Sequence, residues 1–73
     1  MTKLSITLTE DCGAESRHIR DMDCAVGTEE FWYGAHKAIK IVVRQAIRER
    51  MKTEYGGDPP DDSVRKAWSA AGV

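Results

Sequence analysis

Polar and apolar residues alternate at the start of the chain. Leu4, Ile6 and Leu8 are separated by hydroxyl-bearing residues in the run K-L-S-I-T-L-T, which occupies positions 3–9. A period of two places the apolar side chains on one face and the polar side chains on the other, as in a half-buried β-strand. We therefore predict a strand over residues 3–9.

Residues 17–26, R-H-I-R-D-M-D-C-A-V, have a pattern that fits two kinds of element. Met22, Cys24 and Val26 alternate, as they would in a strand. Ile19, Met22 and Val26 also fit the spacing of a helical stripe. We favour a strand over residues 17–26, because the segment before it, E-D-C-G-A-E-S, has the composition of a hairpin loop.

The two strands would form an antiparallel hairpin whose register depends on cross-strand pairs. We expect Leu4 to lie opposite Cys24. The same register places Asp11 opposite Arg17, and a cross-strand pair of opposite charge stabilises the register in which it forms. Cys12 then lies at the hairpin tip, too far from Cys24 to form a disulfide.

The longest uninterrupted pattern covers residues 28–54. It contains no proline, and its apolar residues recur at spacings of three and four, which predicts an amphipathic helix about 40 Å long. Thr28 is a suitable N-cap, and the two glutamates that follow it complement the helix dipole. The segment Y-G-G-D-P-P ends the helix. The apolar face consists of Phe31, Trp32, Ala35, Ala38, Ile39, Val42, Val43, Ala46 and Ile47.

A shorter apolar stripe near the C-terminus predicts a second helix over residues 60–71. The order of elements is then strand, strand, long helix and short helix, a ββαα arrangement of the α+β class in one domain, residues 1–73. Seven strand residues span roughly 23 Å, so the long helix extends beyond the hairpin that packs on it. We expect the short helix to fold back over this extension, with Trp68 as its anchor.

Composition narrows the class of protein. The 73 residues are 41% hydrophobic and 32% charged, which indicates a globular protein with a thin core. No apolar run approaches the ~20 residues that span a bilayer, and the alternating N-terminus does not have the pattern of a signal peptide. We therefore expect a cytoplasmic protein with reduced cysteines and no membrane partner.

The net charge of −1 conceals a separation of charge along the chain. Residues 1–30 contain seven acids and three bases, whereas residues 31–54 contain six bases and two acids. We expect the folded molecule to be an electric dipole. Asymmetry of this kind bears on partners and association rates more than on fold.

The bases of the long helix recur at spacings of three and four, so they form a stripe along one side of it. The members of this stripe are Lys37, Lys40, Arg44, Arg48 and Lys52. Such a stripe suits phosphate groups or an acidic protein. A solvated polar face has the same pattern, and the sequence leaves both interpretations open.

Three aromatic residues, Phe31, Trp32 and Tyr33, follow one another at the start of the long helix. Successive helical residues point about 100° apart, so a helix cannot bury all three on one side. We expect the exposed ones to contact a partner, because aromatic residues are enriched at binding hot spots. The candidate partner-binding residues of the helix are Trp32, Tyr33, Lys37, Lys40, Arg44 and Arg48.

A second candidate surface is acidic. Glu10 and Asp11 lie in the predicted loop, and Asp21 and Asp23 lie on the predicted second strand. Together they would engage a basic groove on another protein. A solvated acidic loop is the competing interpretation.

No constellation of residues indicates catalysis or metal binding. Cys12, His18, Cys24 and His36 are separated by six, six and twelve positions, which is not the close C-x-x-C spacing of structural zinc sites. Nucleophilic catalysis needs a thiol or hydroxyl held against a base, and so short a chain leaves little room for a pocket. We therefore expect a non-enzymatic protein without a metal or cofactor.

These observations favour a small protein-binding module. In size and layout the chain resembles the small inhibitors that phages and mobile elements encode against bacterial defence complexes, such as anti-CRISPR proteins. The resemblance implies steric blocking of a nucleic-acid groove or of a recruited nuclease in the cytoplasm of a bacterial or phage-infected cell. It assigns no site residues.

Two other functions remain open. An N-terminal strand followed by helices is similar to the ribbon-helix-helix repressors, which implies a dimer whose Lys3, Ser5 and Thr7 face the bases of DNA. Residues 12–23 depart from that family. In ribbon-helix-helix proteins a helix follows the strand directly, whereas residues 12–23 of this chain do not have the pattern of a helix. A thin core with exposed aromatic residues also suits a structural subunit that gains stability by oligomerising. The expected partner is thus another protein or protein complex, with nucleic acid and a second copy as alternatives.

Overall fold

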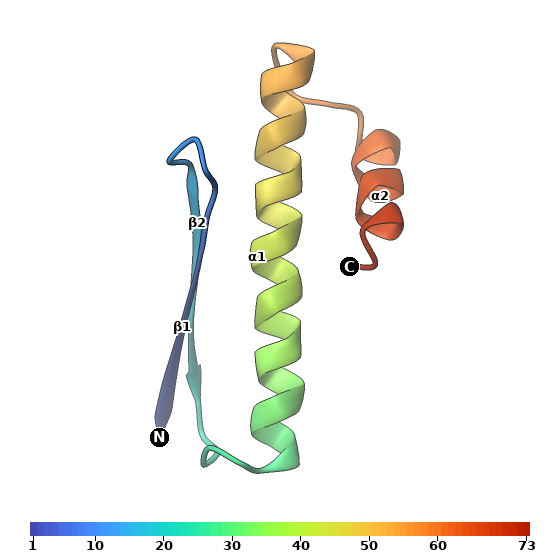
Figure 1. Cartoon of the computed structure of the whole chain (residues 1–73). Helices are drawn as coiled ribbons and strands as arrows, with labels where there is room; N and C mark the ends of the chain where they lie inside the picture. The colour runs from blue at the N-terminus through green and yellow to red at the C-terminus, as the bar shows by residue number, and fades with distance from the viewer.

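The computed structural model describes all 73 residues and contains two strands followed by two helices (Figure 1). The elements are β1 (Thr2–Thr9), β2 (Glu15–Met22), α1 (Glu29–Tyr55) and α2 (Asp61–Ala70). β1 and β2 pair as an antiparallel hairpin on one side of α1, and α2 lies on the other side (Figure 1). The prediction of an α+β fold of the ββαα type is confirmed.

α1 is the element on which the others are assembled. It contacts both strands and α2, whereas α2 contacts neither strand. Its 27 residues, with a rise of 1.5 Å each, span about 40 Å. This length matches the 42 Å long axis of the molecule.

Both ends of α1 are capped as predicted. Thr28 Oγ1 accepts a hydrogen bond of 3.3 Å from the Phe31 N–H, which satisfies one of the otherwise unpaired donors of the first turn. At the other end Gly56 adopts a left-handed conformation with φ of 71°, and its N–H donates to the Lys52 carbonyl oxygen. The observed bounds of both helices lie within one residue of the predicted ones.

The second element is a strand, but it is displaced from the predicted range of 17–26. β2 begins two residues earlier and ends four residues earlier, so Cys24 lies in the connection to α1. This connection turns at Gly27, which has a φ of 96°, and the Thr28 N–H donates to the Ala25 carbonyl oxygen across the turn. The strand ends early because the turn occupies the residues that would have extended it.

The predicted register of the hairpin is wrong by four residues of β2. Leu4 lies opposite Arg20 rather than Cys24. The cause is the tight loop of residues 10–14, which two backbone hydrogen bonds close. Asp11 belongs to this loop and therefore has no cross-strand partner. Because the displacement is an even number of residues, every side chain keeps its predicted face of the sheet.

The core is thin and lies between the hairpin and α1. Nine residues are buried in the whole chain. Met22 fills the space that a side chain at Gly34 would occupy, and it packs with Phe31 and Ala35 in a cluster bordered by Leu4. The buried residues of α1 are mostly small, which lets the helix lie close to the sheet: Phe31, Gly34, Ala35, Ala38, Val42 and Ala46.

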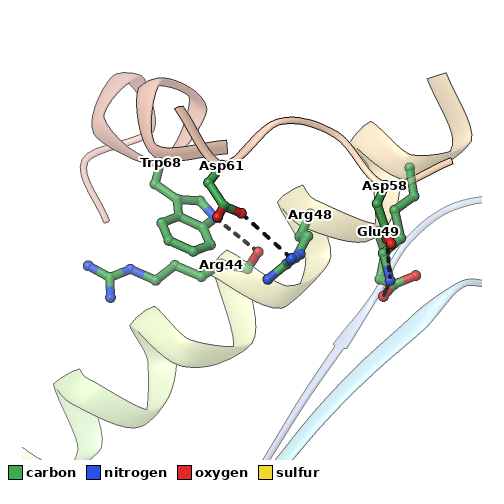
Figure 2. Close-up of polar contacts among 7 residues, drawn as sticks. Arg44, Arg48, Glu49, Asp58, Asp61 and Trp68 are labelled. Atoms are coloured by element: carbon green, nitrogen blue, oxygen red, sulfur yellow. Dashed lines mark hydrogen bonds and ion pairs between the residues drawn. The ribbon is translucent and has the colours of Figure 1, made fainter. Parts of the chain in front are cut away.

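α2 covers the C-terminal half of α1 on the face opposite the hairpin (Figure 1). Val64 is its buried residue. The Nε1–H of Trp68 donates a hydrogen bond of 3.1 Å to the carbonyl oxygen of Arg44 (Figure 2). The prediction that Trp68 anchors the short helix on the long one is confirmed.

Candidate functional site

The face of α1 opposite the hairpin carries most of the predicted basic stripe. Residues spaced by three and four lie on the same side of a helix. Those that share this side are Tyr33, Lys37, Lys40 and Arg44. α2 covers the C-terminal half of the face, and no element lies over the N-terminal half (Figure 1). The face therefore has a covered part and an uncovered part.

In the covered part, two arginines of the stripe contact side chains of α2. The guanidinium carbon of Arg44 lies 5.2 Å from the centre of the Trp68 ring, which is a cation–π geometry (Figure 2). Arg48 forms an ion pair of 3.9 Å with Asp61 (Figure 2). The side chains of Arg44 and Arg48 thus have partners within the molecule.

Lys52 is also paired within the molecule. Its Nζ lies 3.4 Å from a carboxylate oxygen of Glu49 and 3.7 Å from one of Asp58. Ion pairs as exposed as these contribute little to stability, but they reduce the positive charge that a partner would meet. Lys37 and Lys40 are the cations of the stripe that have neither an acidic partner nor a contact with α2.

The uncovered part of the face is a shallow depression of about 480 Å³. Its lining residues are Glu29, Trp32, Tyr33, His36, Lys37 and Lys40. The side chains of Trp32 and Tyr33 are 57% and 67% exposed. The Lys37 ammonium lies 4.5 Å from the centre of the Tyr33 ring, a cation–π contact that holds the lysine side chain beside the ring. We call this depression the aromatic–basic surface.

The three consecutive aromatic residues separate as helix geometry requires. Phe31 points into the core and is 8% exposed, whereas Trp32 and Tyr33 point outward. The rings of Phe31 and Trp32 lie 6.0 Å apart at 79°, an edge-to-face contact through which the core positions the exposed indole. The prediction that the helix cannot bury all three is confirmed. Their contact with a partner stays a prediction.

The predicted acidic residues do not form one surface. Glu10 and Asp11 lie in the hairpin loop, whereas Asp21 and Asp23 lie at the opposite end of the hairpin. Eight strand residues span about 26 Å, which separates the two pairs. Asp21 also lies opposite Lys3 on the outer face of the sheet.

The hairpin loop and the C-terminal half of α1 border a second depression of about 900 Å³. Glu10 and Asp11 line it together with Glu49 and Glu54 of α1. Arg50 also lines it and pairs with Glu54 at 3.7 Å. The sequence pattern does not reveal this acidic grouping, because it depends on how far the hairpin reaches along α1.

Two residues of the aromatic–basic surface were missed by sequence reasoning. His36 and Glu29 line the depression, although neither was a predicted partner-binding residue. The sequence contained the information needed to find them. Counting back from Lys40 in steps of three or four residues, which stay on one side of a helix, reaches His36 and then Glu29. Arg44 and Arg48 were also predicted as partner-binding residues; both contact α2, and their contact with a partner stays a prediction.

The residues considered for metal binding or catalysis lie apart. Cys12 is exposed in the hairpin loop, Cys24 follows β2, and both thiols are free. His18 is half-buried on β2, whereas His36 is exposed on α1. No three His, Cys, Asp or Glu side chains are grouped as metal ligands. Neither helix combines the length and the apolar character that crossing a membrane requires.

Comparison with protein-family models, with curated proteins and with solved structures finds no match to this chain.

Proposed function

We propose that this protein is a small non-enzymatic binding module that recognises another protein through its aromatic–basic surface. One observation carries the proposal. Two exposed aromatic rings, Trp32 and Tyr33, lie beside two lysines that no acid neutralises, Lys37 and Lys40. All four residues line one depression on the N-terminal half of α1, over which no other element lies (Figure 1).

The aromatic side chains suit protein recognition. Tryptophan and tyrosine bury a large area on binding and lose little conformational entropy, because only two side-chain torsions must be fixed. The Trp32 ring already rests against Phe31, and Lys37 already rests against Tyr33. These side chains therefore lose less conformational freedom on binding than side chains without such contacts would lose.

The two lysines select the charge of the partner. Complementary charge steers diffusional encounter and suppresses wrong partners. Glu29 is the single acid that lines the depression, against Lys37 and Lys40. We therefore assign an acidic surface to the partner.

We further propose that the module acts by occupying its partner, as anti-CRISPR-like inhibitors block a bacterial defence complex, in the cytoplasm of a bacterial or phage-infected cell. A chain of 8.2 kDa whose binding face lies along one helix acts most simply by covering a surface. Its two free thiols fit a reducing compartment. Adding saturating amounts of the protein to its purified partner complex tests this part, and unchanged activity of the complex contradicts it.

The alternatives have less support. A ribbon-helix-helix regulator pairs its strand with that of a second chain, whereas β1 pairs with β2 of its own chain. Among the expected base-reading residues only Lys3 is a cation, and it lies opposite Asp21. A structural subunit requires self-association, so a concentration-independent monomer in sedimentation contradicts that alternative.

Site-specific photo-crosslinking tests the binding proposal. A photoreactive phenylalanine analogue replaces Tyr33 in one variant and Ile19 in a matched control, because Ile19 is 50% exposed on the outer face of the hairpin. In cells of the source organism we expect an adduct at position 33 that is absent at position 19. Lys37→Glu combined with Lys40→Glu should abolish it, and titration of the purified captured protein should reproduce the dependence on both lysines. Equal capture at positions 33 and 19, or capture that survives both charge reversals, contradicts the proposal.

A further inference from the structure

We propose that the partner presents an acidic amphipathic helix, which lies along α1 and continues the layer that α2 begins. The inference rests on the proposed function and specifies the structure that the aromatic–basic surface accepts. Two observations support it. α2 shows how this face of α1 binds a helix, and the uncovered part of the face offers the same kinds of contact.

α2 binds its part of α1 through three kinds of contact. The Asp61 carboxylate pairs with Arg48 at 3.9 Å. Val64 is buried, with 2% of its surface exposed. The Trp68 indole lies against the Arg44 guanidinium and donates to the carbonyl oxygen of the same residue (Figure 2). This face of α1 therefore accepts a helix that supplies an acid, an apolar residue and an aromatic ring for one of the cations of α1.

The uncovered part presents matching groups. Lys37 and Lys40 continue the line of cations toward the N-terminus of α1. Here the aromatic rings belong to α1 itself, as Trp32 and Tyr33. An occupant must therefore bring apolar side chains to cover the rings and carboxylates to reach the lysines. Both requirements are met by one helix with acids and apolar residues on the same side.

The dimensions leave room for a second helix. α2 has ten residues and is about 15 Å long, whereas the 27 residues of α1 extend about 40 Å. α2 lies beside the C-terminal half of α1 (Figure 1). The open stretch of about 20 Å corresponds to a helix of roughly 14 residues.

Backbone hydrogen bonding favours a helix over an extended peptide. Extended ligands gain affinity by adding a strand to a free sheet edge. The surface proposed here is a helix face, where backbone N–H and C=O groups are already paired within α1. An occupant must therefore satisfy its own backbone groups, as a helix does.

Nucleic acid and a second copy of this chain fit less well. A phosphate backbone is bound by several cations, whereas only two cations, Lys37 and Lys40, line this depression, with Glu29 beside them. In a second copy the acidic helix is α2, whose Val64 is already buried against its own α1. We therefore assign the occupant to a different protein.

Titration of the full-length nitrogen-15-labelled protein with synthetic helical peptides tests the inference. The probe is a peptide of roughly 14 residues with Glu and Leu at spacings of three and four on one side. We expect saturable amide shifts confined to residues 29–40, the stretch that forms the aromatic–basic surface. Two control peptides, one with Lys in place of each Glu and one scrambled to remove the stripe, should bind at least about tenfold more weakly.

Charge-reversal variants locate the binding groups. Lys37→Glu combined with Lys40→Glu should weaken binding of the probe at least about tenfold. The matched control is Lys3→Glu combined with Lys66→Glu, because it makes the same change of charge at exposed positions outside the depression. The control should bind the probe as the unmodified protein does, and circular dichroism verifies that both variants are folded.

Several results would overturn the inference. Equal binding of the Lys-containing or scrambled peptide contradicts an acidic amphipathic occupant, as do amide shifts outside residues 29–40. Tighter binding of a short DNA duplex at the same residues assigns the surface to phosphate. Concentration-dependent sedimentation with the same amide shifts assigns it to a second copy. If crosslinking at position 33 captures a partner while the probe fails to bind, the helix inference fails and the proposed function stands; probe binding without any captured partner contradicts the proposed function instead.

Discussion

The indole nitrogen of Trp68 donates a hydrogen bond of 3.1 Å to the Arg44 carbonyl oxygen, while the Arg44 guanidinium lies 5.2 Å from the centre of the same indole ring. α2 therefore contacts both the backbone and the side chain of one residue of α1. The carbonyl oxygen also lies within the hydrogen-bond ladder of α1, so the indole is a second donor to it. This relationship makes Arg44 a docking residue for α2.

We expect Trp68→Ala to release α2 while the hairpin stays on α1. The substitution removes both contacts with Arg44, and a helix of ten residues is marginal without tertiary packing. The global free energy of unfolding should fall by about 2 kcal/mol, less than for a fully buried tryptophan. Hydrogen exchange measures the local effect: amides of α2 should lose nearly all of their protection, whereas amides of β1 and β2 should lose no more than the fall in the global free energy of unfolding allows.

Trp68→Phe is the matched control. It retains an aromatic ring against Arg44 but removes the N–H donor, so it should cost only about 1 kcal/mol and leave α2 docked. Loss of protection in the hairpin as complete as that in α2 would show that the whole chain of Trp68→Ala opens as one unit. That result contradicts the separate docking of α2.

The sequence predicts the elements well where the signals are local. The caps at Thr28 and Gly56 act within one turn of the helix they end, so their residue types are sufficient evidence. The register of the hairpin depends instead on the closed loop of residues 10–14. The inner face of β2 carries His18 and Arg20 where alternation of polarity would place apolar residues. The alternating apolar residues at positions 22–26 therefore placed the predicted strand too far toward the C-terminus.

The contact between Met22 and Gly34 predicts non-additive effects of substitution. Gly34→Ala gains about 1 kcal/mol of helix propensity, but its methyl group must displace the end of the Met22 side chain. We therefore expect a change within about 0.5 kcal/mol, because these two effects oppose each other. Met22→Ala should cost about 2 kcal/mol through loss of core packing.

The double variant separates the two effects. In the Met22→Ala background the obstructing side chain is gone, so Gly34→Ala should stabilise the protein by about 1 kcal/mol. Urea unfolding of the four proteins closes the double-mutant cycle. Additivity of the two substitutions would contradict the proposed competition for one space.

Removal of the N-cap hydroxyl should destabilise the protein at the start of α1, where Thr28 Oγ1 also donates a hydrogen bond of 2.8 Å to the Ala25 carbonyl oxygen. Thr28→Ala removes the oxygen that accepts from Phe31 and should lower the free energy of unfolding by about 1 kcal/mol. Thr53→Ala is the matched control, because its hydroxyl donates to the Glu49 carbonyl oxygen within the helix. The control should be neutral or stabilising by a few tenths of a kcal/mol, roughly the difference in helix propensity. Equal losses in urea unfolding would contradict the role of Thr28.

The candidate surface is predictable only in part. Exposure of Trp32 and Tyr33 follows from the angle between successive helical residues, so the sequence suffices for it. The sequence pattern does not show which cations of the stripe are free to bind a partner. Asp58 and Asp61 reach the cations of α1 only because the chain folds back after this helix. A contact between residues that are distant in sequence thus decides which half of the stripe is open.

Lys40 and Arg44 lie one helical turn apart and provide the sharpest comparison of binding with stability. Arg44→Glu removes the cation–π contact and places a carboxylate against the Trp68 ring, so the free energy of unfolding should fall by about 1 kcal/mol. Lys40→Glu makes the same change of charge at an uncovered position, so the free energy of unfolding should change by less than about 0.5 kcal/mol. Lys40→Glu should nevertheless weaken binding of the acidic helical probe several-fold, roughly the effect of losing one complementary charge.

Urea unfolding and probe titration of both variants check this comparison. If Arg44→Glu lowers probe affinity without loss of stability while Lys40→Glu has no effect, the partner binds over the covered part and α2 must move to admit it. If both folded variants, together with Trp32→Ala, bind the native partner normally, the aromatic–basic surface is not the binding site. The acidic depression of Glu10 and Asp11 would then be the working surface, because it is a concave region in which acids outnumber bases.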